Sequence, residues 1–449
     1  MKVFLEIPLE IVKYAQHLAL GRNDEGMGII KVSHLKPEAL LSEDVKDRNG
    51  RLLIPAGTIL TETHIRVIKI WGIVEVEIED ASETDPDSSS AEAIDPEQLQ
   101  AAETLLQERF LFCDREHPAI AELFRIGRQR LAAQMAKSPP GKRPSQTTSG
   151  GRRSSGRGRS GRTAESCEDR FSHIHQLIQK DIKLTTLPAV FKRINETIMN
   201  PNSSSREIAD LISADTGLSA RLLKLVNSVF YGYPSQIDSL SQAVSIVGTN
   251  QLSVLAFGID IVGQFKRISS RDIDMESFWR HSIACGVIAR LLASTRNIQN
   301  TERLFVAGIL HDIGRLIIYH YTPRYATDIL EMAGESGKLL RDGEEEYLGG
   351  DHSRIGALLL QIWKLPQSLE NAVRHHHNPS DSQSILEPAI VHVADIAALA
   401  LGTGSSGDTH VPPLDPAAWK QLGLSVNGLE PIATQAERQM NEIFQFFCQ

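Results

Sequence analysis

The first 80 residues combine the two hydrophobic spacings that distinguish strands from helices. Residues 74–78 (VEVEI) alternate apolar and polar side chains, as a half-buried strand does. Residues 64–71 (HIRVIKIW) lie between a threonine that can cap a helix and a glycine that can end one. Asn49 and Gly50 predict a tight turn. The pattern therefore predicts a small α/β unit, and it contains no catalytic cluster.

Beyond this unit, apolar residues recur at helical spacing. Between residues 95 and 137, six of them are spaced as in short amphipathic helices: Leu105, Leu106, Phe110, Ile120, Leu123 and Phe124. We expect a helical connector there, with dimerisation as one role. From Cys167 to the end every strong pattern is helical, for example in residues 208–212, 218–227 and 243–248. The chain is therefore predicted to be mainly α.

Two polar tracts interrupt these patterns. Residues 79–98 are acidic, whereas residues 138–163 hold seven Lys or Arg, no acid and no large apolar residue. The whole chain carries a net charge of −9, so the remainder carries −9 − 7 = −16. A tract like 138–163 cannot bury enough apolar surface to offset its ordering entropy, which favours a flexible basic linker. Binding of RNA or of an acidic surface by its arginines is the weaker alternative.

The tracts divide the chain into four segments: a small α/β module (1–80), an acidic stretch with a helical connector (81–136), a disordered basic Gly/Ser/Arg linker (137–166) and a helical domain (167–449). At roughly 150 residues per domain, this length suggests about three units. The four cysteines lie far apart without CxxC spacing, which argues against disulfides and a thiolate zinc site. No stretch has the features of a signal peptide or a membrane span, so we expect a cytoplasmic protein.

Histidines are concentrated in one part of the helical domain. Eight of the fifteen lie between positions 281 and 392, about a quarter of the chain. Five of these histidines, together with two aspartates, follow the order H…HD…H…HH…D, at His281, His311, Asp312, His352, His376, His377 and Asp395. Imidazoles and carboxylates grouped in this way are typical of a buried metal site for phosphate chemistry. The first interpretation is a metal-dependent phosphohydrolase scaffold.

Neighbouring features have plainer explanations. A histidine on an apolar helix, such as His320 or His392, is more often a hydrogen-bonded core residue than a ligand, and His375 is expected to face solvent. The helices around Gly217 are spaced like a helix-turn-helix, but leucines would bury the second helix, so DNA binding is not expected. An aromatic cluster between helices is more often core than a base-stacking platform, which applies to Phe230, Tyr231 and Tyr233.

Several segments of the helical domain together resemble the HDOD family, an HD-related signal-output domain. They are LTTLPAVFKRINETIMN, EIADLISADTGLSARLLKLVNSVFYGYPSQIDSLSQAVSIVGTNQL, HDIGRL, HSRIGALLLQIWKLP and VRHHHNP, which fall between about residues 175 and 400. Residues 26–78 resemble the small module often found ahead of HD-GYP phosphodiesterase domains. The resemblance implies a C-terminal all-helical HD-like domain preceded by a small α/β module.

The resemblance also assigns candidate ligands. In catalytic HD proteins two histidines and two aspartates hold a divalent metal, and the matching residues are His281, His311, Asp312 and Asp395. In HD-GYP relatives further histidines bind a second metal, and the matching residues are His352, His376 and His377. An aspartate shared by two ions is part of that arrangement, with Asp312 in this role. Nitrogen and oxygen ligands leave iron, manganese, magnesium and zinc as candidates.

The sequence departs from the HD-GYP pattern at three points. Arg315, a candidate catalytic residue beside Asp312, replaces the usual lysine; it keeps the positive charge but cannot donate a proton at ordinary pH. No GYP motif follows His377. Ser277 stands where some relatives have a glutamate, so a third metal is not expected.

These departures and the family resemblance favour an output protein of bacterial-type signal transduction, whose HDOD domain binds other signalling proteins and retains a divalent-metal site. The complete ligand set supports the alternative, a metal-dependent phosphohydrolase or phosphodiesterase acting on a nucleotide or cyclic dinucleotide. A homodimer is compatible with either hypothesis, and neither requires a membrane or DNA.

Overall fold

The structure is a computed structural model of the chain, and it divides into two compact units, residues 1–90 and 91–449. The residues that it describes are 27–32, 35–46, 52–61, 64–65, 68, 73, 75–79, 95–137, 166–180, 193, 197, 205–233, 236–266, 270, 272–296, 298 and 300–448. Most of the predicted acidic tract and nearly all of the predicted basic linker lie outside these residues.

The N-terminal unit contains two small antiparallel sheets. The first has the strand order β1-β5-β2, and the second pairs β3 with β4; the bounds are β1 (Met27–Lys31), β2 (Leu40–Leu41), β3 (Val45–Lys46), β4 (Leu52–Ile54) and β5 (Glu75–Glu79). The predicted alternating strand is confirmed, because Val76 and Ile78 of β5 are buried and Glu77 between them is partly exposed. The turn predicted at Asn49 and Gly50 lies outside the described residues.

The second unit consists of α-helices and two short 3-10 helices among its described residues, so the prediction of an all-helical C-terminal part is confirmed. The α-helices are α3 (Pro96–Arg109), α4 (Pro118–Lys137), α5 (Cys167–Lys180), α8 (Ser205–Ser213), α9 (Thr216–Val226), α10 (Leu240–Val247), α11 (Thr249–Phe265), α12 (Met275–Thr295), α13 (Thr301–Leu310), α14 (Ile313–Tyr321), α15 (Pro323–Ser336), α16 (Leu340–Leu348), α17 (His352–Ile362), α18 (Gln367–Arg374), α19 (Leu386–Ala400), α20 (Pro416–Leu422) and α21 (Leu429–Cys448). The 3-10 helices are η3 (Pro379–Asp381) and η4 (Val426–Gly428).

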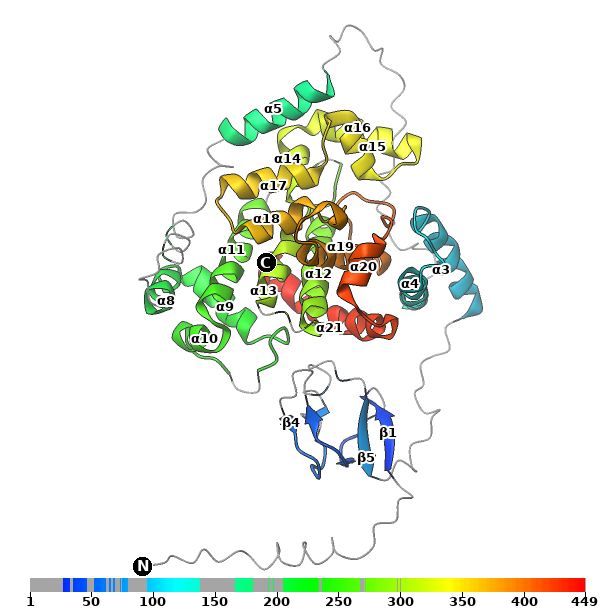
Figure 1. Ribbon diagram of the computed structural model, residues 1–449, viewed down its shortest axis with the longest axis vertical. Coiled ribbons are helices and arrows are strands. Elements are labelled where there is room, and N and C mark those ends of the chain that lie inside the picture. The colour runs from blue at the N-terminus through cyan, green and yellow to red at the C-terminus, as the bar shows by residue number, and fades with distance from the viewer. Residues whose placement is uncertain are drawn as a thin grey trace, which may run out of the picture. The chain divides into compact units, whose positions relative to one another are not determined.

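Helices α12, α13 and α19 form the centre of this unit (Figure 1). Each is apolar around most of its circumference, which is typical of a helix enclosed by a large core. Gly286 of α12 and Gly308 of α13 allow the two backbones to approach closely, since a Cβ atom at Gly308 would lie 2.6 Å from the Cα of Gly286. His281 and His311 each lie about one helical turn from one of these glycines, so this approach brings the two histidines close to each other.

The helices predicted as a connector, α3 and α4, pack on the C-terminal helices. Arg109 donates to the backbone oxygen of Leu399 at 3.4 Å, and Arg130 pairs with Glu437 of α21 at 3.0 Å. A Cβ atom at Gly127 of α4 would lie 2.6 Å from the backbone oxygen of Ala400, so the contact is tight. These helices therefore belong to the same compact unit as the region of the histidines.

The helices considered as a helix-turn-helix, α8 and α9, bury the apolar face of the second helix, as the leucine pattern indicates; its buried residues are Leu218, Leu222, Leu225 and Val226. Among the described helices, none is by itself long and apolar enough to cross a membrane. Helices α10 and α11 pass that test only as a pair, bent by 115° at Gly248.

Candidate metal centre

The seven predicted ligands come from five separate places and meet in the interior of the helical unit. His281 lies on α12, Asp395 on α19 and His352 at the start of α17, where Asp351 caps the helix. His311 and Asp312 occupy the short break between α13 and α14, and His376 and His377 follow α18. All seven side chains are buried. The structure therefore brings all seven predicted residues together, and their binding of a metal stays a prediction.

Four ligand atoms form a first set: His281 Nε2, His311 Nε2, Asp312 Oδ2 and Asp395 Oδ1. The five separations that involve a histidine nitrogen of this set are 3.3, 3.5, 3.1, 3.1 and 3.7 Å. Ligands held at 2.0–2.1 Å from one ion in a tetrahedron would be about 3.3–3.4 Å apart. These five separations are of the size expected of ligands that share a single divalent ion, and His281, His311 and Asp312 form the closest group among them.

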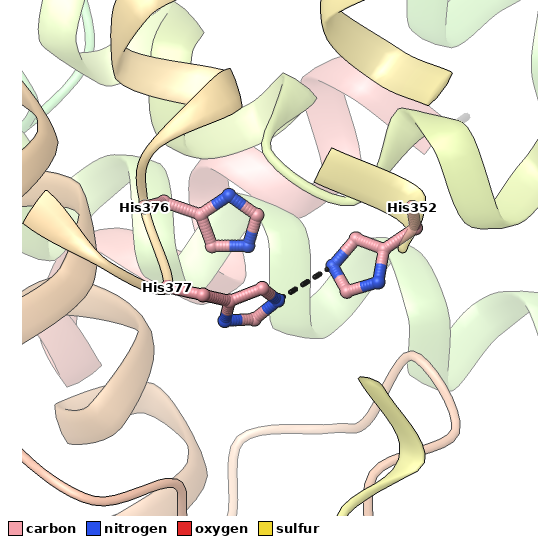
Figure 2. Close-up of side chains that lie close together, drawn as sticks. All are labelled: His352, His376 and His377. Atoms are coloured by element: carbon pink, nitrogen blue, oxygen red, sulfur yellow. Dashed lines mark hydrogen bonds between the residues drawn. The ribbon is translucent and has the colours of Figure 1, made fainter. Parts of the chain in front are cut away.

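Three histidines and the other oxygen of Asp312 form a second set. His352 Nε2 lies 2.9 Å from Asp312 Oδ1 and 3.0 Å from His377 Nε2. Figure 2 shows His376 beside this pair, with the three imidazole rings facing one space. The rings of His376 and His377 have their centroids 3.9 Å apart. Asp312 thus contributes one carboxylate oxygen to each set.

In two of the candidate ligands, a hydrogen bond to a backbone carbonyl group determines which ring nitrogen remains available for a metal. His311 donates from Nδ1 to the Gly308 oxygen, and His376 donates from Nδ1 to the Val373 oxygen, both at 2.7 Å. In the neutral form of each imidazole, the lone pair therefore lies on Nε2. His376 Nε2 and Asp312 Oδ2 are buried without a hydrogen-bond partner. Buried polar atoms in this state are costly unless a ligand satisfies them, which supports metal binding.

The charges in the site also favour cations. Burial opposes protonation of His352, as does Arg315, yet the carboxylates of Glu344 and Asp312 raise its pKa to about 9. In contrast, burial and the neighbouring His311 lower the pKa of His376 to about 3, so its imidazole is neutral. A divalent ion would displace a proton from His352, whereas the neutral imidazole of His376 could bind an ion without losing a proton. No thiolate contributes, since burial raises the pKa of nearby Cys285.

Arg315, predicted as a catalytic residue, is buried and its guanidinium group is fully engaged. It donates to Glu344 at 3.0 Å and to Ser406 at 2.6 Å, and it pairs with Asp408. Its nearest approach to Asp312 is 3.7 Å. The structure thus places Arg315 beside the ligands and between acidic side chains, with its donors engaged by Glu344, Ser406 and Asp408.

A loop that follows α19, residues 402–410, lies against the site. Ser406 is fully buried beside Arg315, and its backbone oxygen accepts a bond from Tyr319 at 2.7 Å. Ser277 accepts a hydrogen bond from the backbone N–H of Ser405 at 3.0 Å. The loop therefore lies against α12 at Ser277 and His281 and against Arg315.

Of the histidines not expected to be ligands, His392 lies in the core as expected, whereas His320 and His375 differ from the expected exposure. His392 donates to the backbone oxygen of His376 at 2.7 Å and accepts from the N–H of Asp415 at 2.9 Å, so both of its nitrogens are satisfied. His320 is exposed rather than part of the core, and His375 is half-buried. His392 therefore supports the segment that carries His376 without taking part as a ligand.

Sequence reasoning missed Glu344, which is buried and bonded to both His352 and Arg315. It is the first of three consecutive glutamates, and the other two are exposed. A signal was present, because Glu344 lies four residues after Leu340 and four before Leu348, on the apolar face of an amphipathic helix. A carboxylate at such a position requires a buried partner.

Comparisons with known proteins match part of the helical unit to a known family. The HDOD domain model matches residues 184–379. An uncharacterized protein of Treponema pallidum (strain Nichols) is 29% identical over 232 residues, which are 51% of this chain and 43% of that protein. The match thus spans less than half of that relative.

Two solved structures show similar proteins. An HDOD domain protein of unknown function from Geobacter sulfurreducens is 24% identical, covers 62% of this chain and 97% of its own, and superposes with a TM-score of 0.50, which supports the fold. A protein from Shewanella amazonensis SB2B, provisionally named a phosphohydrolase, is 25% identical, with 60% and 97% coverage and a TM-score of 0.49.

Proposed function

Since residues 184–379 are an HDOD domain, we propose that the helical unit is a metal-dependent phosphohydrolase that holds two divalent ions between its ligand sets. The observation that carries this proposal is the position of Asp312. One carboxylate oxygen faces His281 and His311, and the other faces His352. A carboxylate shared between two ligand sets can hold two ions close enough together to act on one phosphate group.

The donors of the two sets are compatible with such ions. Five imidazoles and two carboxylates provide seven side chains without sulfur, and imidazole-rich sets favour zinc or iron over magnesium, while manganese accepts mixed nitrogen and oxygen ligands. We therefore expect manganese, iron or zinc rather than magnesium. Ions in such a pair supply Lewis-acid activation of water and of a phosphoryl oxygen.

The chain's own residues supply the rigidity that this chemistry needs. His311 and His376 are held by backbone carbonyl groups, so their rings cannot turn without breaking a buried hydrogen bond. His392 in turn holds the backbone of His376. Arg315 is bonded to acidic groups, so we assign it to the support of the site and not to contact with a substrate.

This proposal reverses the preference drawn from the sequence, and the burial of all seven candidate residues close to one another supports it. The signalling hypothesis keeps one specific support, the burial of all seven ligands beneath neighbouring elements such as the loop 402–410. A site so enclosed admits a substrate only if that cover moves. In this second candidate function, the domain acts through other signalling proteins and its ions are structural.

The experiment compares the wild type with Asp312→Asn and with Asp381→Asn, which changes an exposed carboxylate four residues after His377. Each purified protein is loaded with Mn²⁺, analysed for bound metal and assayed with bis(p-nitrophenyl) phosphate, p-nitrophenyl phosphate, a nucleotide panel and cyclic di-GMP. We expect two ions per chain and turnover in the wild type and in Asp381→Asn, and loss of both in Asp312→Asn. Two bound ions without turnover of any phosphate ester would support the signalling function instead.

A further inference from the structure

We propose that Glu344 is the positioning residue of the second metal position, acting through His352; this inference rests on the proposed pair of ions. Glu344 lies on α16, and its side chain is almost completely buried. It does not face the ligand space itself. Its carboxylate instead contacts the side of His352 that is remote from the other ligands.

Both oxygens of Glu344 are used. Oε2 accepts from His352 twice, from Nδ1 at 2.5 Å and from the backbone N–H at 2.9 Å. Oε1 accepts from the Nε of Arg315 at 3.0 Å. Since the same carboxylate holds the ring and the backbone of His352, it fixes the start of α17 as well as the orientation of the imidazole. Arg315 fixes the carboxylate from the opposite side.

The consequence for metal binding lies in the tautomer of His352. With Nδ1 donating to Glu344, the lone pair of a neutral imidazole lies on Nε2, which faces Asp312 Oδ1 and His377 Nε2. A carboxylate that accepts from the far nitrogen of a ligand histidine also makes the imidazole a stronger donor to a metal. No histidine of the first set bonds to Glu344 among the contacts of the described residues. The effect is therefore specific to the second position.

The same helix supplies a matched control. Glu345 is exposed, and its nearest charged partner is Arg354 at 3.9 Å. Glu344→Gln and Glu345→Gln each remove one negative charge from adjacent positions of α16 with almost no change in volume. Only the first alters the bond to His352. A difference in metal binding between the two variants would therefore result from the position of Glu344 and not from the loss of one negative charge.

The test is a titration of metal-free full-length protein with Mn²⁺, followed by electron paramagnetic resonance. We expect the wild type and Glu345→Gln to bind two ions with the signal of a coupled pair. Glu344→Gln should keep one ion at unchanged affinity, bind the second about 10–100-fold more weakly and show the signal of an isolated ion. His352→Ala should give the same pattern. The variant that combines Glu344→Gln with His352→Ala should bind the second ion no more weakly than His352→Ala alone.

Three outcomes overturn the inference. If the wild type binds two ions and Glu344→Gln binds both with unchanged affinity, Glu344 does not position His352, while the proposed function stands. If Glu344→Gln weakens both positions equally at an unchanged melting temperature, its effect is not specific. If the wild type binds no second ion, the inference fails together with the proposed pair of ions. Circular dichroism melting of each variant shows that a loss of metal is not a loss of fold.

Discussion

Gly314 and His352 lie so close that a Cβ atom added at Gly314 would be 2.0 Å from the backbone oxygen of His352. Gly314 is the glycine of the HDIG segment, two residues after Asp312. The contact between α14 and α17 at this point therefore brings Asp312 and His352 together, with their ligand atoms 2.9 Å apart. Gly314 therefore allows α14 and α17 to approach closely enough for the two ligand sets to meet at Asp312.

Gly314→Ala should separate these helices. Because the clash is with backbone atoms, a shift of α14 or α17 is required, and we expect a loss of about 1–3 kcal/mol in the free energy of unfolding and weaker binding of the second ion. Gly334→Ala in α15 is the control, since no atom lies within 4 Å of the added Cβ. That change should stabilise the protein by up to about 1 kcal/mol. Equal stabilities of the two variants in urea denaturation would contradict the prediction.

Arg315→Met should destabilise the helical unit strongly. The change leaves Glu344 and Asp408 without their buried cation, and breaking one side of such a network typically costs about 3–5 kcal/mol. Arg280→Met, which removes an exposed partner of Glu276, should cost about 0–1 kcal/mol. Denaturant unfolding of both variants measures the difference. A small effect of Arg315→Met together with a large rise in KM for a phosphate ester would instead assign Arg315 to the substrate.

Removal of metal should lower the melting temperature of the wild type. Ions that bind only the folded state stabilise it, by about 2.7 kcal/mol at a free concentration 100 times the dissociation constant. A chelator should therefore shift the melting curve of the metal-loaded wild type and leave that of Asp312→Asn unchanged, since this variant has lost the negative charge that both sets share and one of the two carboxylate oxygens. An identical shift in the two proteins would show that the ions bind elsewhere.

Replacement of residues 138–163 by a Gly/Ser tract of the same length should leave the stability of the helical unit unchanged. The segment has no large apolar residue to contribute to a core. Its length is kept because α4 packs on α19 and α21, whereas α5, which follows the segment, packs on α16 and α17. A lower melting temperature of the replacement would show that the arginines contact the folded unit.

The sequence by itself determined the elements and the candidate ligands. The VEVEI strand and the amphipathic helices followed from their periodicities, because alternation and helical spacing are local properties of the chain. The order of histidines and aspartates identified seven residues that the structure places in one buried site. Neither the periodicities nor the motifs indicated that α3 and α4 would pack on the helical unit, since that depends on contacts such as Gly127 with Ala400.

Only the tertiary structure decided which candidate residues face the ligand space and which support them. Asp312 and Arg315 lie one helical turn apart in the sequence, yet the first faces the ligand space and the second is held by Asp408, almost a hundred residues away. Glu344 and Glu345 are identical neighbours, and only the packing of α16 buries the first one beside His352. The sequence gives the chemical type of each residue. Its partners depend on which distant helices pack beside it, because hydrogen bonds and charge pairs act only over short distances.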